Sequence, residues 1–306
     1  MRRYALRRIL LGIVTVFLVS LIVFVASRLS GDVVYLLLPQ DATQEEVDSL
    51  RSKLGLDRPL PVQFLYFLNG AIKGDFGTSY RYTGRQAIDV VFERLPATME
   101  LAFSAFFISI VSGLLLGVVS ATKRDSVIDT GAKLFALIGQ SMPSFWVSIM
   151  AILIFSVKLG WLPTSGQGGL KHLILPAVTT AWFSIASILR LTRSSMLDVM
   201  DSEFIKMARI KGNRNYVVIW KHALRNALIP IVAMAGIQLA HLLGGVVIAE
   251  TIFNWPGLGS LILEGVNSRD YALVQAGVLV ISVTFVTINL VVDLVYGIID
   301  PRIRYQ

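Results

Sequence analysis

Long apolar runs alternate with polar segments along most of this 306-residue chain. Six runs contain enough apolar residues to cross a hydrocarbon core about 30 Å thick as a helix. They occupy residues 9–29, 98–121, 131–157, 174–193, 229–250 and 272–297. Longer polar segments lie between them at 30–97, 194–228 and 251–271. The pattern predicts an all-α integral membrane protein with six transmembrane helices and one small domain between the first two.

Basic residues set the predicted orientation of the spans. Four arginines precede the first run, and eight Lys and Arg side chains lie between Arg190 and Arg225. Because cytoplasmic loops carry such an excess, both termini and the long loop after the fourth run are predicted to be cytoplasmic. The other two polar segments are then periplasmic. The first run also loosely fits a cleaved signal peptide, but it is longer than the usual apolar core of such a peptide and further spans follow.

Composition agrees with a membrane protein. Hydrophobic residues make up 55% of the chain and charged residues 16%, and the mean hydropathy is +0.68, well above that of soluble domains. The positive-inside bias explains the net charge of +8, so nucleic-acid binding is not expected. The chain has no cysteine and three scattered histidines, which excludes thiolate sites and gives no metal-ligand spacing.

Local signals refine three of the predicted elements. Thr43 is placed to cap an amphipathic helix over 41–54. Gly113 and Gly117 have the small-xxx-small spacing that lets another membrane helix approach closely. Pro143 interrupts the third run and predicts a helix that kinks against its neighbours or lines a cavity.

Polar side chains within the spans are candidates for a transport pathway, because burying them in lipid is costly. Four of them are predicted either to line a pathway or to pack between helices: Gln140, Gln238, His241 and Asn289. Asp293, near the cytoplasmic end of the last span, is predicted to form a structural ion pair with Arg190 or Arg193. A proton-coupled secondary carrier, the alternative from another class, needs an acidic relay that the sequence does not show.

The chain carries no motif for ATP hydrolysis or for another enzymatic reaction. The patterns G-x-x-x-x-G-K, G-x-S-x-G and H-E-x-x-H are all absent from the sequence. The sequence therefore gives no sign of an enzyme, and the chain is not expected to bind and hydrolyse ATP through a P-loop of its own.

The basic stretch 203–230 carries the motif A-x-x-x-G…H-A-L-R-N-A-x-x-P. The motif residues are Ala208, Gly212, His222, Ala223, Leu224, Arg225, Asn226 and Pro230. In this motif the chain resembles the cytoplasmic loop of ABC-importer permeases, in the form found in the dipeptide, oligopeptide and nickel family. Departures from the frequent residues of that loop are Phe204, Met207, Ile210 and Asn213.

The resemblance extends in order along the chain. G-D-F-G-T-S at 74–79, L-T-R-S-S-M at 191–196, P-G-L-G at 256–259 and Asp300-Pro301-Arg302 all match patterns of the family. It implies the type I ABC-importer permease fold, and the 30–97 segment is then the periplasmic domain between the first two spans.

In this family the cytoplasmic loop forms short helices that dock into a groove of a separate ATPase. The resemblance assigns this coupling role to Glu203, Phe204, Met207, Ala208, Lys211, Gly212, His222 and Pro230. Over 203–210, helical spacing gives Phe204, Met207 and Ala208, or Lys211 in its place, one docking face. Gly212 would end this helix, and a second helix over 216–227 would lead into Pro230 at the start of the fifth span.

The resemblance also implies partners. These are a second, homologous permease that forms a heterodimer with this chain, two cytoplasmic ATPases that bind ATP and Mg²⁺, and a periplasmic binding protein, all at a bacterial inner membrane. No cofactor is implied in this chain. The binding protein would deliver its cargo near Asp75, Phe76, Trp255 and Gly257. The implied cargo is a dipeptide or short oligopeptide, and the alternatives within the family are nickel, a metal chelate or glutathione.

Overall fold

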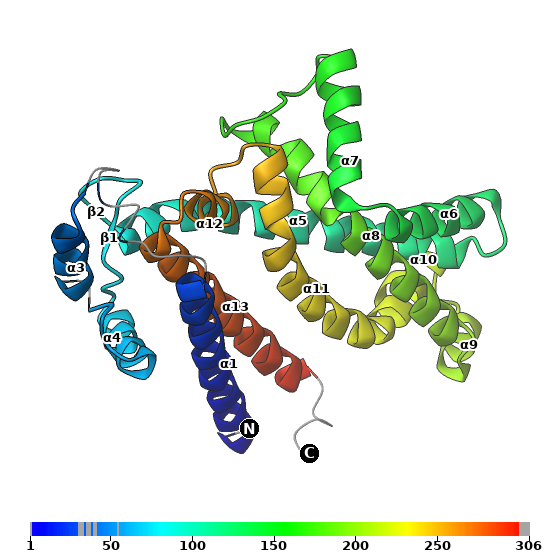
Figure 1. The fold of residues 1–306 in the computed structure, drawn as a ribbon. Helices are drawn as coiled ribbons and strands as arrows, with labels where there is room; N and C mark the ends of the chain where they lie inside the picture. Colours follow the sequence, from blue (N-terminus) through cyan, green and yellow to red (C-terminus); the bar gives the residue numbers. More distant parts are fainter. Residues whose placement is uncertain (1, 30–33, 35–37, 39–41, 54, 300–306) are drawn as a thin grey trace. The chain divides into compact units, whose positions relative to one another are not determined.

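The computed structural model describes residues 2–29, 34, 38, 42–53 and 55–299, and the motif Asp300-Pro301-Arg302 lies outside them. Figure 1 shows the order of the elements along the chain. The chain divides into two compact units. Unit 1 comprises Thr98–Trp255 and the segment that begins at Val291, and unit 2 comprises Arg2–Ala97 and Pro256–Leu290. Among the described residues nearly every element is a helix, as predicted.

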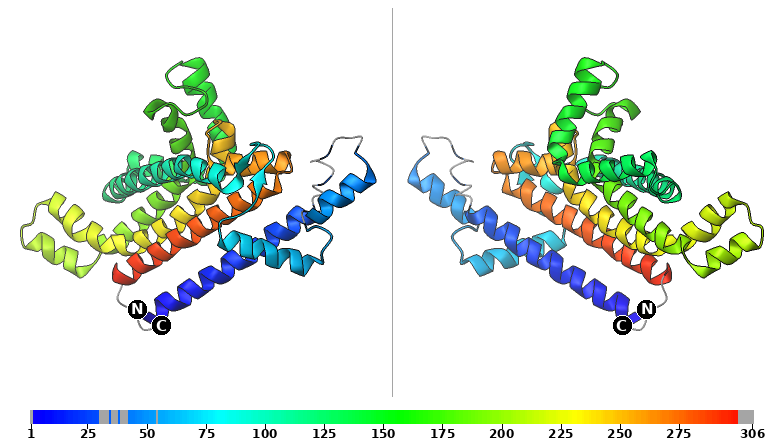
Figure 2. Two further views of the ribbon diagram at one scale, coloured as in Figure 1. Left: turned by 90° about the vertical axis from the view of Figure 1, so that its left-hand side faces the viewer. Right: turned by 90° about the vertical axis from the view of Figure 1, so that its right-hand side faces the viewer.

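Unit 2 combines the first span with segments from both sides of unit 1. Its elements are α1 (Arg2–Leu29), α3 (Gln44–Lys53), α4 (Leu60–Ile72), β1 (Thr78–Ser79), β2 (Arg85–Gln86), the start of α5 (Ala87–Thr122), α12 (Leu258–Asn267) and most of α13 (Tyr271–Ile299). The two strands pair antiparallel. Helix α1 lies beside α13 (Figure 2), because a Cβ atom added to Gly12 would lie 2.6 Å from Val286.

The predicted cap of α3 is confirmed. The backbone N–H of Thr43 donates to the Glu46 carboxylate over 2.9 Å, and the N–H of Glu46 donates to the Thr43 hydroxyl over 3.4 Å. This reciprocal pair is a capping box, which satisfies donors that the first turn of a helix otherwise leaves without partners.

Unit 1 contains the remaining helices. They are the rest of α5, α6 (Val127–Ser141), α7 (Ser144–Ala151) with a π-helical continuation (Ile152–Lys158), α8 (Leu170–Met200), α9 (Glu203–Ile210), α10 (Asn215–Val217), a π-helical segment (Val218–Ala223) and α11 (Leu224–Ile252). In Figure 2, α9 and α10 form a helical hairpin beyond the end of α8.

Within the described residues, five helices are long and apolar enough to cross a membrane, and a sixth span results if one bent pair counts as a single span. The bent pair corresponds to the predicted span 131–157. Helices α6 and α7 meet at 109° around Pro143, so this span is broken rather than gently kinked. Several helices are also longer than predicted: α5 begins at Ala87 and α8 continues to Met200. Hydropathy reports only the apolar part of a helix, and the helices continue beyond it.

Close packing of α5 against α8 confirms the role predicted for the two glycines. A Cβ atom on Gly113 would lie 2.7 Å from Ile188, and one on Gly117 would lie 2.5 Å from the Cβ atom of Thr192. No side chain fits at these distances. The two backbones can therefore approach closely only because both positions are glycine.

A buried carboxylate joins α5, α6 and α8 at one end of unit 1. Asp129 is fully buried, and the Arg193 guanidinium donates to both of its oxygens, over 2.6 and 2.9 Å. The Ser120 hydroxyl donates over 2.6 Å, the Asp125 backbone N–H over 3.1 Å, and the Lys133 ammonium lies 3.0 Å away. Charge-assisted bidentate bonds of this kind fix geometry strongly. We call these five residues the Asp129 cluster.

Replacement of Gly117 with valine should destabilise the protein by about 1–3 kcal/mol, because the new side chain overlaps Thr192. The measurement is the apparent melting temperature of the protein purified in detergent. Gly131→Ala is the matched control, since a Cβ atom there meets nothing within 4 Å. Equal melting temperatures for the two variants would contradict the close packing of α5 on α8.

Replacement of Asp129 with asparagine should cost roughly 3–5 kcal/mol, because it leaves the partly buried Arg193 without its counter-charge. The control is Asp125→Asn: the Asp125–Arg124 pair is exposed, and asparagine tolerates the positive φ at this position. Thermal denaturation should show a large shift for the first variant and almost none for the second. A small shift for Asp129→Asn would show that the cluster does not hold the three helices together.

Candidate functional site

Helix α9 is the centre of the predicted docking segment, and its bounds match the predicted ones. Its C-terminal carbonyls are satisfied: the Asn213 side-chain amide donates to the carbonyl of Ala208, and the Gly212 N–H donates to that of Arg209, each over 2.9 Å. Gly212 has a φ of +77°, which glycine adopts without strain. The predicted glycine turn after α9 is confirmed.

The inner face of α9 packs against its own chain. Ile205 is completely buried and Ala208 is 8% exposed. The buried residues around them come from α5, α8, the π-helical segment and α11: Val118, Ala121, Met196, Val218, Ala223 and Ala227. We call this set, with Ile205 and Ala208, the α9 seat. Ala208 was predicted to belong to the docking face, but the structure turns it inward.

The outer face of α9 is apolar and uncovered. Phe204 is 46% exposed, Met207 is 53% exposed and Ile210 is 78% exposed. Three exposed large apolar side chains on an eight-residue helix form a patch that water solvates poorly, and such patches mark contact surfaces. The structure thus keeps Phe204 and Met207 on the predicted face and adds Ile210.

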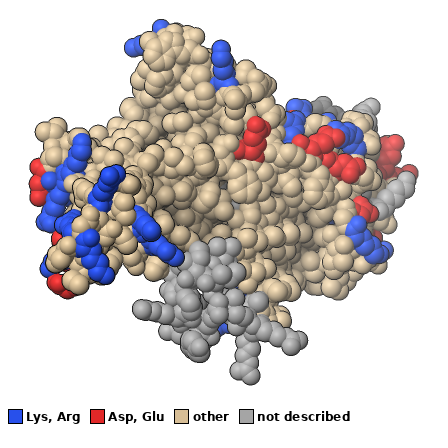
Figure 3. Space-filling view, turned by 180° about the vertical axis from the view of Figure 1, so that it is seen from behind, with Lys and Arg blue, Asp and Glu red and all other residues tan. Residues whose placement is uncertain are grey.

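Basic side chains are frequent on the α9 and α10 segment. Lys and Arg gather over the part of the molecule that contains α9 and α10, on the left in Figure 3. Lys211 is exposed, and the ammonium of Lys206 lies 2.7 Å from the carboxylate of Glu203 in an exposed pair. The segment therefore combines an apolar centre with a mainly positive rim.

The second predicted helix differs in extent from the observed one. Helical structure begins at Asn215 and continues through the π-helical segment into α11 without a break. Pro230 consequently lies inside α11 rather than at the start of a separate span. His222 is half-buried, and its carbonyl accepts a hydrogen bond from the Asn226 side chain over 2.8 Å. The second arm of the hairpin and α11 are thus one continuous helical element, whereas α9 is separated from it by the turn at Gly212.

The four predicted pathway residues occupy different environments. Gln140 donates to the Ser187 hydroxyl over 3.4 Å, and Asn289 donates to the carbonyl of Phe285 in its own helix. Gln238 is 3% exposed. His241 is exposed and lines a cavity between α7, α8 and α11.

The ion pair predicted at the end of the last span differs from the observed one. Arg193 binds Asp129 in place of Asp293, and Arg190 is exposed. Asp129 was not predicted as a partner of Arg193, because it lies in the polar segment that precedes the third apolar run. Its position at the first turn of α6, after the cap residue Ser126, is the only sequence signal it carries.

Of the four residues predicted to face a binding protein, only Asp75 is exposed. Its carboxylate accepts a hydrogen bond from the N–H of Gly77 over 3.0 Å. Phe76 packs against the buried residues of α5, α12 and α13 in unit 2. Trp255 is 1% exposed, and Gly257, also buried, precedes the first residue of α12. These three residues therefore contribute packing and chain direction rather than exposed side chains.

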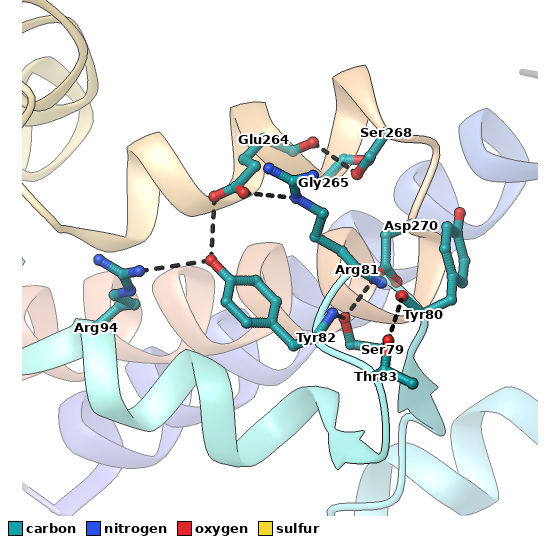
Figure 4. Close-up of polar contacts among 10 residues, drawn as sticks. All are labelled: Ser79, Tyr80, Arg81, Tyr82, Thr83, Arg94, Glu264, Gly265, Ser268 and Asp270. Carbon is teal, nitrogen blue, oxygen red and sulfur yellow. Dashed lines mark hydrogen bonds and ion pairs between the residues drawn. The ribbon is translucent and has the colours of Figure 1, made fainter.

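A polar network that the sequence did not reveal holds the turn 79–82 in unit 2 (Figure 4). The Ser79 hydroxyl and the Arg81 backbone N–H both donate to one carboxylate oxygen of Asp270. The Arg81 guanidinium donates to Glu264 over 2.8 Å, and the Tyr82 hydroxyl donates to the same carboxylate over 3.1 Å. The turn after β1 is thus bound to α12 and to the residue before α13.

Asp270 also caps a helix. Its other carboxylate oxygen accepts the N–H of Leu273 over 3.1 Å, so it caps the start of α13 while it binds the 79–82 turn. An aspartate directly before a helix is a recognisable cap signal, but no sequence signal indicates its partner 191 positions away. Burial raises the pKa of the neighbouring Tyr80 hydroxyl.

No cluster of three or more His, Cys, Asp or Glu side chains suited to a metal ion occurs in the described ranges. The contacts described above for the α9 segment are hydrogen bonds, ion pairs and apolar contacts.

Comparisons with known proteins match the whole chain. The family model for the binding-protein-dependent transport system inner membrane component matches residues 113–305, and the model for the N-terminal part of such membrane components matches residues 1–102. Similar relatives include the dipeptide transport system permease protein DppB of Alkalihalophilus pseudofirmus and the glutathione transport system permease protein GsiC of Escherichia coli K12. Each is 39% identical, with both chains covered completely.

A putative peptide transport system permease of Brucella abortus is 41% identical over 98% of both chains. Among solved structures, inward-facing forms of the MetNI methionine ABC transporter are similar in fold, with TM-scores of 0.57 and 0.54 at 19% and 22% identity. Each match covers 69% of this chain and 96% of the other. The apolar helices and the family match agree, and the chain belongs to the binding-protein-dependent transport system inner membrane components, the permease subunits of ABC importers.

Proposed function

We propose that this chain forms part of the membrane pathway through which an ATP-driven importer passes short peptides into the cytoplasm. Complete coverage at 39% identity by a dipeptide permease, together with the peptide permease at 41%, is the observation that carries the substrate class. A stand-alone proton-coupled carrier has no comparable support.

The two faces of α9 support its role in coupling. Phe204 and Met207 point away from the chain and suit the groove of a separate ATPase subunit. Ile205 and Ala208 pack against the other residues of the α9 seat, which include residues of α5, α8 and α11. A displacement of α9 by the ATPase would therefore move three long helices.

The Asp129 cluster extends this coupling to the broken span. Met196 in the α9 seat and Arg193 in the cluster lie on the same helix, α8. Arg193 holds the first turn of α6, and α6 leads to the 109° bend. We expect movement of α9 to reach the bend through this ion pair.

The proposed assembly contains four further subunits. A homologous permease would form a heterodimer with this chain, two ATPases would bind ATP and Mg²⁺, and a periplasmic binding protein would deliver the peptide. This chain would hold no cofactor. The basic rim around α9 supports a cytoplasmic location for the hairpin and for both termini at the bacterial inner membrane.

Glutathione is a second candidate cargo, because the glutathione permease matches the full chain at the same identity as the dipeptide permease. Nickel import gains no support from the described residues, which contain no metal-ligand cluster.

The cargo is tested by the ATPase activity of the complex purified with its partner subunits. Binding protein loaded with dipeptide should stimulate ATP hydrolysis several-fold over unloaded binding protein, and loading with a nickel chelate should not. Glutathione and longer peptides are compared in parallel. Stimulation by the nickel chelate alone would overturn the peptide assignment, and stimulation by glutathione alone would favour the second candidate.

The docking face is tested by the double variant Phe204→Ser, Met207→Ser. Burying each apolar side chain contributes about 1.5–3 kcal/mol, so its loss should abolish co-purification of the ATPases and reduce uptake by at least about tenfold. Val127→Ser, which removes another apolar side chain that is 89% exposed, is the control and should retain both. Normal ATPase binding by the double variant would exclude this face as the docking site.

A further inference from the structure

A cavity of about 170 Å³ lies beside the break in the third span. It is bounded by α7, α8 and α11, all within unit 1. Helix α7 starts at Ser144, directly after Pro143, and Ser144 lines the cavity. A break in a membrane helix is tolerated where the backbone lies against protein or water rather than lipid. The position therefore fits a hydrated part of a transport pathway.

The polar lining of the cavity consists of hydroxyl groups and one imidazole. Hydroxyl groups come from α7 and α8, and the imidazole of His241 comes from α11. Ser148 and Ser184 are 2% and 3% exposed. The Ser148 hydroxyl donates to the Ser144 carbonyl over 3.0 Å, so it can meet a ligand only as an acceptor. No Asp, Glu, Lys, Arg or Cys lines this cavity in the part of the chain that the structure describes.

One of these hydroxyls lacks a hydrogen-bond partner. The Thr180 hydroxyl is buried and unpaired among the described residues. Its neighbour Thr179 shows the usual alternative, because the Thr179 hydroxyl donates to the carbonyl of Leu175 over 2.8 Å. An unpaired buried hydroxyl costs free energy, and a ligand in the adjacent cavity can remove that cost.

The hydroxyl and imidazole groups that line the cavity favour some classes of ligand over others. A metal ion such as Ni²⁺ needs several imidazole, thiolate or carboxylate ligands, and one histidine does not supply them. Free carboxylate and ammonium groups would lack a counter-charge in the cavity. Peptide amides, which each have one neutral donor and one neutral acceptor, match hydroxyls that can both donate and accept. The cavity is smaller than the 300–1,000 Å³ typical of sites that enclose a whole small molecule, so it can hold only part of a peptide.

We propose that Ser148, Thr180, Ser184 and His241 form a contact site for the backbone amides of the peptide as it passes the broken span. This inference rests on the proposed function. It assigns to the permease itself a site that binds the peptide backbone and is indifferent to peptide side chains.

The test uses the complete importer in proteoliposomes, with a radiolabelled dipeptide and its binding protein. Thr180→Val keeps the shape of the side chain and removes the hydroxyl, and it should lower uptake at subsaturating loaded binding protein by about threefold to tenfold, the factor for one hydrogen bond. Stimulation of ATP hydrolysis by loaded binding protein should persist. The variant would thus consume more ATP for each peptide imported.

Thr192→Val is the matched control, because Thr192 lies on the same helix, also carries a buried unpaired hydroxyl, and does not line the cavity. Ser184→Ala is a second variant that should lower uptake if Thr180→Val fails to assemble. Wild-type uptake in both cavity variants would overturn the site while leaving the importer intact. Failure of the wild-type complex to import any peptide would instead overturn the proposed function.

Discussion

The buried carboxylate of Asp129 is the interaction on which the arrangement of unit 1 depends. Desolvating a carboxylate is costly unless several donors compensate for it, and here a bidentate guanidinium, an ammonium, a hydroxyl and a backbone N–H do so. These donors come from α5, α6, α8 and the turn between α5 and α6. Because each donor must stay in place to satisfy the charge, the three helices cannot slide independently at this end. The glycine contacts farther along α5 impose the same constraint by shape.

Helix α9 has one face buried against its own chain and another face exposed. Burial of Ile205 requires contact with the long helices, and exposure of Phe204 and Met207 requires that nothing from this chain cover them. Adjacent positions on a helix point about 100° apart, so eight residues suffice for both faces. The continuous path from the hairpin into α11 adds a second mechanical link. A rigid seat on one side and an apolar surface on the other are what an element needs if it is to transmit movement between subunits.

Much of the fold could be predicted from sequence because its signals are local. The apolar runs, the Thr43 cap, the glycine spacing and the turn at Gly212 each depend on a few neighbouring residues. Helical periodicity placed Phe204, Met207 and Ala208 near one another. It could not show which of these side chains face the rest of the chain, and Ala208, next to Met207 in sequence, proved to be buried. The partners of Arg193 and Asp270 depend on how distant segments meet. Hydropathy likewise recorded Pro143 as an interruption, while the 109° bend follows from packing.

The chemistry of the cavity bears on how selectivity is divided among subunits. A site lined by hydroxyls and one imidazole can recognise an amide, which every peptide has, but its described lining has no carboxylate, ammonium or guanidinium group with which to distinguish acidic from basic side chains. One or two neutral hydrogen bonds contribute only about 0.5–1.5 kcal/mol each, too little to hold a cargo tightly. Weak contact favours release toward the cytoplasm, since a pathway that bound its cargo strongly would retain it. Under the proposed function, discrimination between cargoes would therefore occur before a peptide reaches the membrane subunit, at the protein proposed to deliver it.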